Sequence, residues 1–243
     1  MKRRKSSELK SMAREALCGN YGTFIGTSLI YGIIALLLSC IPAFAIPTNS
    51  SYLMVALRFM ISFLIGLIVN VLAAGLSRIA LNISRKQTVQ IGDLFHAFRH
   101  HPDRFLILGL ILSLISNICM IPGNILSFTV TSGTGDTMEL LEKTLCMSLL
   151  SLAGSILYIV LTLALSMSTM LLVDYDDISA MEALKESVKM MRGNKWRYFY
   201  ITTLSFLGLI LISVFGLYIP LLWILPYVYV TQAFFYRELN QEI

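Results

Sequence analysis

Charged residues are scarce in this chain. They make up 14% of its 243 residues, whereas an ordinary soluble domain has about 25%. This supply is too small to cover the surface of a soluble fold of this size. Glycine (15) and proline (6) are also few, which excludes collagen-like and low-complexity chains. With 56% apolar residues the chain is too hydrophobic to be disordered, so a polytopic membrane protein is the class that remains.

The four cysteines show no pairing pattern. Cys18, Cys40, Cys119 and Cys146 form no CxxC, which argues against a disulfide framework or a metal site. The HExxH, GxSxG and GxxxxGK[ST] patterns of metalloproteases, serine hydrolases and nucleotide-hydrolysing proteins are also absent. We therefore expect a protein that is not an enzyme, without catalytic residues, metal ligands or cofactors.

Six long apolar runs account for most of the sequence. A bilayer core of about 30 Å needs about 20 helical residues, and each run meets or approaches that length. The runs are continuous, which predicts helices and excludes the alternating strands of a β-barrel. We expect an all-α transmembrane bundle of six spans in a single domain, 1–243, with a basic amphipathic segment at 1–20. The predicted spans are about 21–46, 52–83, 104–130, 144–173, 197–215 and 217–236.

The basic residues are distributed very unevenly around these spans. With six spans, 17 of the 19 lysines and arginines fall on one side, and only Arg58 and Lys143 do not. By the positive-inside rule, both termini are expected in the cytoplasm. The net charge of +5 then indicates contact with anionic lipid headgroups on the cytoplasmic side, and no nucleic acid.

Short amphipathic helices are predicted on the cytoplasmic side. Residues 9–17 and 178–191 have helical apolar spacing, and each is followed by a Gly-Asn pair that favours a helix end. Ser179 and Asp177 are both candidate N-caps for the second helix. These helices either lie in the headgroup plane or pack under the bundle as connecting helices, and the two interpretations are compatible.

Several polar residues and prolines fall inside the predicted spans. Arg58 near the outer end of span two is either functional or a snorkelling side chain. Asn70 and Asn117 either line a solute path or hold the bundle by interhelical hydrogen bonds. Pro122 and Pro226 are expected to kink or break their helices, and broken helices build some transporter sites.

Two clusters of titratable residues lie outside the spans. Asp93, His96 and His100 share one face of a predicted helix and could bind a transition metal, although a solvated interfacial face is the simpler explanation. Asp174, Asp176 and Asp177 suit either Mg²⁺ or acid–base chemistry, or favourable charge at the start of the following helix.

The segment Glu182–Arg197 and the later segments Leu204–Gly208, Leu222–Tyr227 and Phe234–Leu239 resemble one family. That family is the uncharacterised group of bacterial integral membrane proteins catalogued as domain of unknown function 975. The resemblance covers nearly the whole chain, implies a location in the bacterial cytoplasmic (plasma) membrane, and brings no known activity. The residues that we associate with the signature are Glu182, Ala183, Ser187, Gly193, Lys195, Trp196, Pro226, Tyr227 and Tyr236.

These observations lead to two functional expectations. The first is a non-enzymatic accessory or scaffold for a membrane transport or export system, with the bilayer and a membrane-protein partner or a second copy as its contacts. The alternative is a transporter or permease in its own right, with a cavity near Arg58, Asn70 and Asn117.

Overall fold

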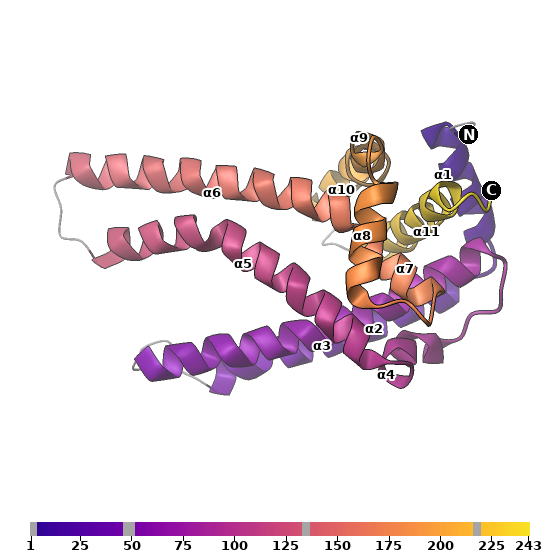
Figure 1. Cartoon of the computed structure of the whole chain (residues 1–243), viewed down its shortest axis with the longest axis horizontal. Helices are drawn as coiled ribbons and strands as arrows, with labels where there is room; N and C mark the ends of the chain where they lie inside the picture. Colours follow the sequence, from indigo (N-terminus) through magenta and orange to yellow (C-terminus); the bar gives the residue numbers. More distant parts are fainter. Residues whose placement is uncertain (1–3, 46–51, 133–136, 216–219) are drawn as a thin grey trace.

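Helices provide all of the regular structure in the described part of the chain. The computed structural model describes residues 4–45, 52–132, 137–215 and 220–243, and no strand occurs among them. The predicted all-α class is confirmed. Four long helices extend from a group of shorter helices at one end (Figure 1).

The long helices have the length and composition of membrane spans. Their outward faces carry apolar side chains such as Phe44 and Leu53, which are 88% and 77% exposed and suit lipid better than water. Four of the six predicted spans therefore correspond to membrane-length helices. These elements are α2 (Tyr21–Ala45), α3 (Tyr52–Ser84), α5 (Pro102–Ser132) and α6 (Thr137–Leu165), which α7 (Ser168–Asp174) continues.

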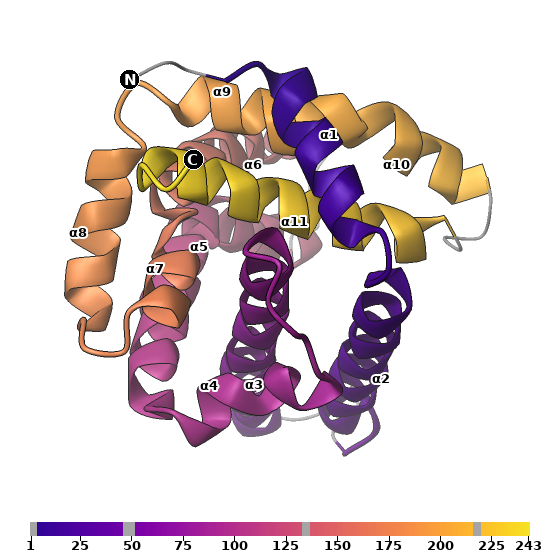
Figure 2. The same cartoon turned by 90° about the vertical axis from the view of Figure 1, so that its right-hand side faces the viewer.

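The shorter helices form what we call the platform. Both ends of the chain lie there, side by side (Figures 1 and 2), and the Arg4 backbone N–H donates to the Glu238 carboxylate at 3.0 Å. The platform consists of α1 (Ser6–Leu17), η1 (Ile91–Phe95), α4 (His96–Arg99), α8 (Ala180–Met190), α9 (Lys195–Phe199) and α11 (Leu221–Leu239).

The predicted span 197–215 is built from three consecutive helical pieces. α9 leads into a π-helical turn, η2 (Tyr200–Leu204), and then into α10 (Ser205–Phe215). The predicted span 217–236 corresponds to α11. Neither is among the four membrane-length helices of the described residues, and the predicted boundary at 216–219 lies outside those residues.

The contacts of α11 show that it crosses the ends of other helices. Its Tyr227 hydroxyl donates to the Lys10 carbonyl at 3.3 Å, and its Arg237 guanidinium donates to the Ser84 carbonyl. Both partners lie at the platform end of the molecule, although Tyr227 and Arg237 are ten residues apart, about 15 Å along a helix. Figure 2 shows α11 running across the direction of α3. The described residues therefore contain four membrane-length helices, and they do not establish the six spans that the sequence predicts.

The predicted amphipathic helices are present in the platform. α8 begins at Ser179, whose hydroxyl accepts from the Glu182 N–H while the Glu182 carboxylate accepts from the Ser179 N–H at 2.9 Å. Of the two candidate N-caps, Ser179 is the one used. These bonds to Ser179 lower the pKa of the Glu182 carboxyl. The helix stops before Gly193, which has a positive φ of 76° that favours glycine.

Ser187 joins α8 to the junction between α6 and α7. Its hydroxyl donates to the Ala164 carbonyl at 3.0 Å and accepts from the Met167 N–H at 3.1 Å. Both backbone groups flank the break between the two helices, and Ser187 is fully buried. An unpaired buried backbone group is costly. The Ser187 hydroxyl pairs two of them, so this one side chain stabilises the junction.

We expect Ser187→Ala to lower the free energy of unfolding by roughly 1–3 kcal/mol, because it leaves two buried backbone groups without partners. Thermal unfolding of the purified protein in detergent measures the change. Ser148→Ala is the matched control, since Ser148 is exposed and bonds only within its own helix. Equal effects of the two substitutions would contradict this role.

Candidate functional site

A polar cavity lies between the long helices. It has a volume of about 400 Å³ and takes its walls from α3, α5, α6 and α7. No charged residue lines it. Its polar lining residues are Ser62, Asn70, Ser113, Ser116, Asn117, Tyr158, Thr162, Ser166 and Thr169.

Asn70 forms the α3 side of the cavity. It lies in the middle of the span Ala56–Ser84, yet its side chain is exposed. Its amide Nδ2 donates to the Gly66 carbonyl of its own helix at 2.9 Å. α5 passes directly beside it, since a Cβ added to Gly109 would lie 3.4 Å from the Asn70 Cβ. An exposed amide at this depth needs a polar space to face, and the cavity provides one.

Asn117 forms the α5 side of the same cavity, and its Nδ2 donates to the Ser113 carbonyl at 2.8 Å. The expectation of interhelical hydrogen bonds is therefore wrong for both asparagines within the described residues. Each amide bonds to the carbonyl four residues earlier in its own helix. This arrangement leaves the two side-chain carbonyl oxygens and the second N–H of each amide available to the cavity.

The hydroxyl groups of the cavity follow the same pattern. Thr162 donates to the Tyr158 carbonyl at 2.9 Å, and Ser166 donates to the Leu163 carbonyl at 3.0 Å. Their oxygens keep acceptor capacity, while the asparagine amides supply donors. Such a lining matches water or a small neutral polar solute. An ion would find no opposite charge here to offset the loss of its hydration.

The cavity brings together two of the five residues selected from the sequence. Arg58 is half-buried on α3 but lies about 18 Å along the helix from Asn70 and does not line the cavity. Pro226 is buried in α11, away from the cavity. Pro122 lies within α5, which continues past it, and its side chain is outside the described residues.

None of the hydroxyl residues of the cavity was selected from the sequence, although each helix carries a signal for them. Ser62, Gly66 and Asn70 repeat every four residues, which places them on one face of α3. From α6 to α7, Thr162, Ser166 and Thr169 recur at spacings of four and three. A search for polar stripes, one face at a time, would have found the cavity.

Arginines secure the platform end of the helices that line the cavity. From α3, Arg78 donates to the Val173 carbonyl at 2.8 Å. From α5, Arg104 donates to the Tyr175 and Ile178 carbonyls at 3.1 and 3.0 Å. All three acceptors belong to the segment 173–178 that follows the cavity wall, so this segment fixes the distance between α3, α5 and α7.

Asp174 lies in the same segment and is held by two partners. Arg85 donates to its carboxylate at 3.0 Å, and the Tyr236 hydroxyl donates to it at 2.8 Å. The hydrogen bond with Asp174 raises the pKa of Arg85 above its usual value. Partial burial raises the pKa of Glu242, but hydrogen bonds from Arg85, Asn240 and Arg237 outweigh this effect and lower it to about 2.

The titratable clusters form no metal site among the described residues. Asp93 accepts from the Gln90 backbone N–H at 2.9 Å, while the rings of His96 and His100 stack on each other at 4.2 Å. No group of three or more potential ligands in the described ranges is placed to hold a metal ion. Burial, the nearby Arg78 and the neighbouring His100 lower the pKa of His96.

The signature residues taken from the sequence belong to the platform and not to the cavity. Tyr227 and Tyr236 make the contacts described above, Ala183 is fully buried, and Lys195 is half-buried. Trp196 also belongs to the platform, but its side chain does not pack within it: it is 81% exposed, beside α6. Most of the signature therefore describes how the platform is held together.

A comparison with protein families gives one match, which covers residues 1–242. The matching family is described as Protein of unknown function (DUF975). No curated protein and no solved structure matches the chain.

We expect Asp174→Asn to destabilise the protein by about 1.5–3 kcal/mol, because it removes the charge that Arg85 is bonded to. Unfolding in detergent, followed by intrinsic fluorescence, measures the effect. Asp176→Asn is the matched control: its carboxylate is 3.8 Å from Arg104 and its side chain is 62% exposed, so we expect a loss of about 1 kcal/mol or less. If Asp176→Asn is as damaging as Asp174→Asn, the ion pair is not the cause.

Proposed function

Since the chain belongs to this family of proteins of unknown function, its role has to be inferred from its own residues, and we propose that it is a membrane transporter for a small neutral polar solute. The observation that carries the proposal is the pair of asparagines, Asn70 and Asn117, that line one cavity between membrane-length helices. The proposed role is non-enzymatic and needs no cofactor.

The chemistry of the cavity supports this substrate class. Polar side chains are costly inside a membrane span. They therefore line solute paths more often than they face lipid. The lining combines amide donors with amide and hydroxyl acceptors, which suits hydroxyl, amide or urea-like groups. A volume of about 400 Å³ is within the range of small-ligand pockets.

We propose that the platform faces the cytoplasm of a bacterial plasma membrane, because nearly all lysines and arginines lie on its side. Six crossings, as the sequence predicts, require α10 and α11 to span the bilayer as a hairpin. The contacts of α11 with Lys10 and Ser84 favour four crossings instead. Four and six crossings are both even numbers, so either topology places the two termini on the same side of the membrane.

Transport is tested with purified protein in liposomes. We expect faster uptake of urea or glycerol than in empty liposomes, measured by light scattering after an osmotic step. Asn70→Leu combined with Asn117→Leu should reduce the rate roughly tenfold or more, because polar solutes lose their hydrogen-bond partners in the cavity. Ser148→Ala, outside the cavity, should leave the rate unchanged. Uptake that persists in the double variant would contradict the proposal.

The number of crossings is tested by labelling single cysteines in a variant in which the four native cysteines are serine. With four crossings, we expect Leu217→Cys to stay unlabelled by a membrane-impermeant thiol reagent applied outside cells. Labelling would show that the hairpin crosses. Met138→Cys, 79% exposed at the start of α6, is the positive control and Gln87→Cys the negative one, since four and six crossings both place them outside and inside respectively.

The accessory or scaffold role is a second proposal. The observation that favours it is the exposed surface of α8, where Met181 is 52% exposed and is flanked by charged residues. The asparagine double variant separates the two proposals in cells. A scaffold keeps its function when the cavity is made apolar, whereas a transporter loses it.

A further inference from the structure

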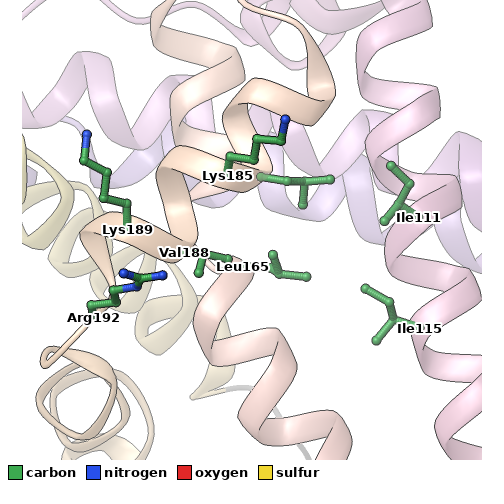
Figure 3. A pocket seen from close by; sticks show the side chains of 8 residues that line it. Ile111, Ile115, Leu165, Lys185, Val188, Lys189 and Arg192 are labelled. Atoms are coloured by element: carbon green, nitrogen blue, oxygen red, sulfur yellow. The ribbon is translucent and has the colours of Figure 1, made fainter.

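A second cavity, of about 490 Å³, lies between α8, the interior of α5 and the end of α6. Its floor and one wall are apolar, with Ile111 and Ile115 from α5 and Leu165 from α6. Figure 3 shows Ile111 and Ile115 facing this groove from one side, opposite the basic residues of α8. The two isoleucines belong to the span Pro102–Cys119, so the groove opens at membrane depth.

The other wall of the groove is basic. Lys185, Lys189 and Arg192 follow one another at spacings of four and three, which places them along one side of α8. All three are exposed. The groove therefore combines basic residues of α8 with an apolar floor, which matches a charged headgroup attached to a hydrocarbon chain.

The acidic residues of α8 do not line this groove. Glu182 and Glu186 line a neighbouring cavity, near Tyr175 and Asn240, which shares Lys185 with the groove. Lys189 is bonded to Glu186 at 3.3 Å, but both side chains are largely exposed, and such pairs exchange readily. Arg192 makes no side-chain hydrogen bond or ion pair within the described part of the chain. The groove thus presents positive charge without a neutralising carboxylate in its lining.

We propose that this groove binds an anionic phospholipid. Lys185 and Arg192 bind the phosphate of the headgroup, and one acyl chain lies on Ile111, Ile115 and Leu165. Basic pockets between membrane helices on the cytoplasmic side are suited to anionic headgroups, and the apolar floor selects a ligand that also has a hydrocarbon chain. A free anion satisfies only the first of these two features. The site is separate from the solute cavity and does not require transport.

The test uses the full chain in mixed detergent micelles, with bound lipid counted by native mass spectrometry. We expect phosphatidylglycerol to bind at least about tenfold more tightly than phosphatidylcholine of the same acyl chains. Lys185→Gln combined with Arg192→Gln should remove about tenfold or more of that preference, since each basic residue at an anionic headgroup contributes severalfold. Lys5→Gln combined with Lys86→Gln removes the same charge from exposed platform sites outside the groove and should change little.

Three outcomes would overturn the proposal. The first is a wild type without any preference for phosphatidylglycerol. The second is an equal loss of that preference in the two double variants, which would indicate that only the general surface charge matters. The third is complete displacement of the lipid by excess inorganic phosphate, which would indicate a site for free anions. A further variant, Ile115→Trp, fills the groove without changing charge and should also weaken phosphatidylglycerol binding. Retained binding in the asparagine double variant separates this test from that of transport.

Discussion

The arrangement of the membrane helices depends on the segment 173–178. Arg78 of α3 and Arg104 of α5 donate to its carbonyl groups, and Arg85 binds Asp174 within it. Hydrogen bonds from charged donors to backbone carbonyls are stronger than neutral ones, and here they close the helices at the platform end. Away from that end, Figure 1 shows α3 and the pair α5 and α6 separating from each other. The polar cavity lies between α3 on one side and the pair α5 and α6 on the other.

A second group of charged residues, centred on Glu238, holds the two ends of the chain in the platform. Glu238 is almost fully buried and accepts from both the Arg197 guanidinium, at 2.6 Å, and the Arg4 N–H. A buried carboxylate is tolerated only when it is paired, so α1, α9 and α11 must be in place together. This requirement explains why α11 lies across the bundle: its charged second half has its partners in the platform.

Sequence reasoning succeeds where one physical term dominates. Continuous apolar runs identify α2, α3, α5 and α6, because only a helix satisfies its own backbone in lipid. It does not decide the course of α10 and α11, since a hydrophobic run has the same composition whether it passes through a bilayer or lies across its surface. Asp174 shows a similar limit: it lies close to the start of α8 in sequence, yet its partner Arg85 is 89 residues away. Such pairings depend on tertiary structure and leave no local pattern.

The polar cavity and the basic groove share one wall. Leu165 lines both of them, from the end of α6 that Ser187 holds through the Ala164 carbonyl. A ligand changes a second site only when it binds two arrangements of the protein with different affinity. In the structure the α6–α7 junction has one arrangement, in which Ser187 of α8 holds both of its sides. A lipid seated between α8 and α5 would therefore lie against the same Leu165 that faces the solute cavity.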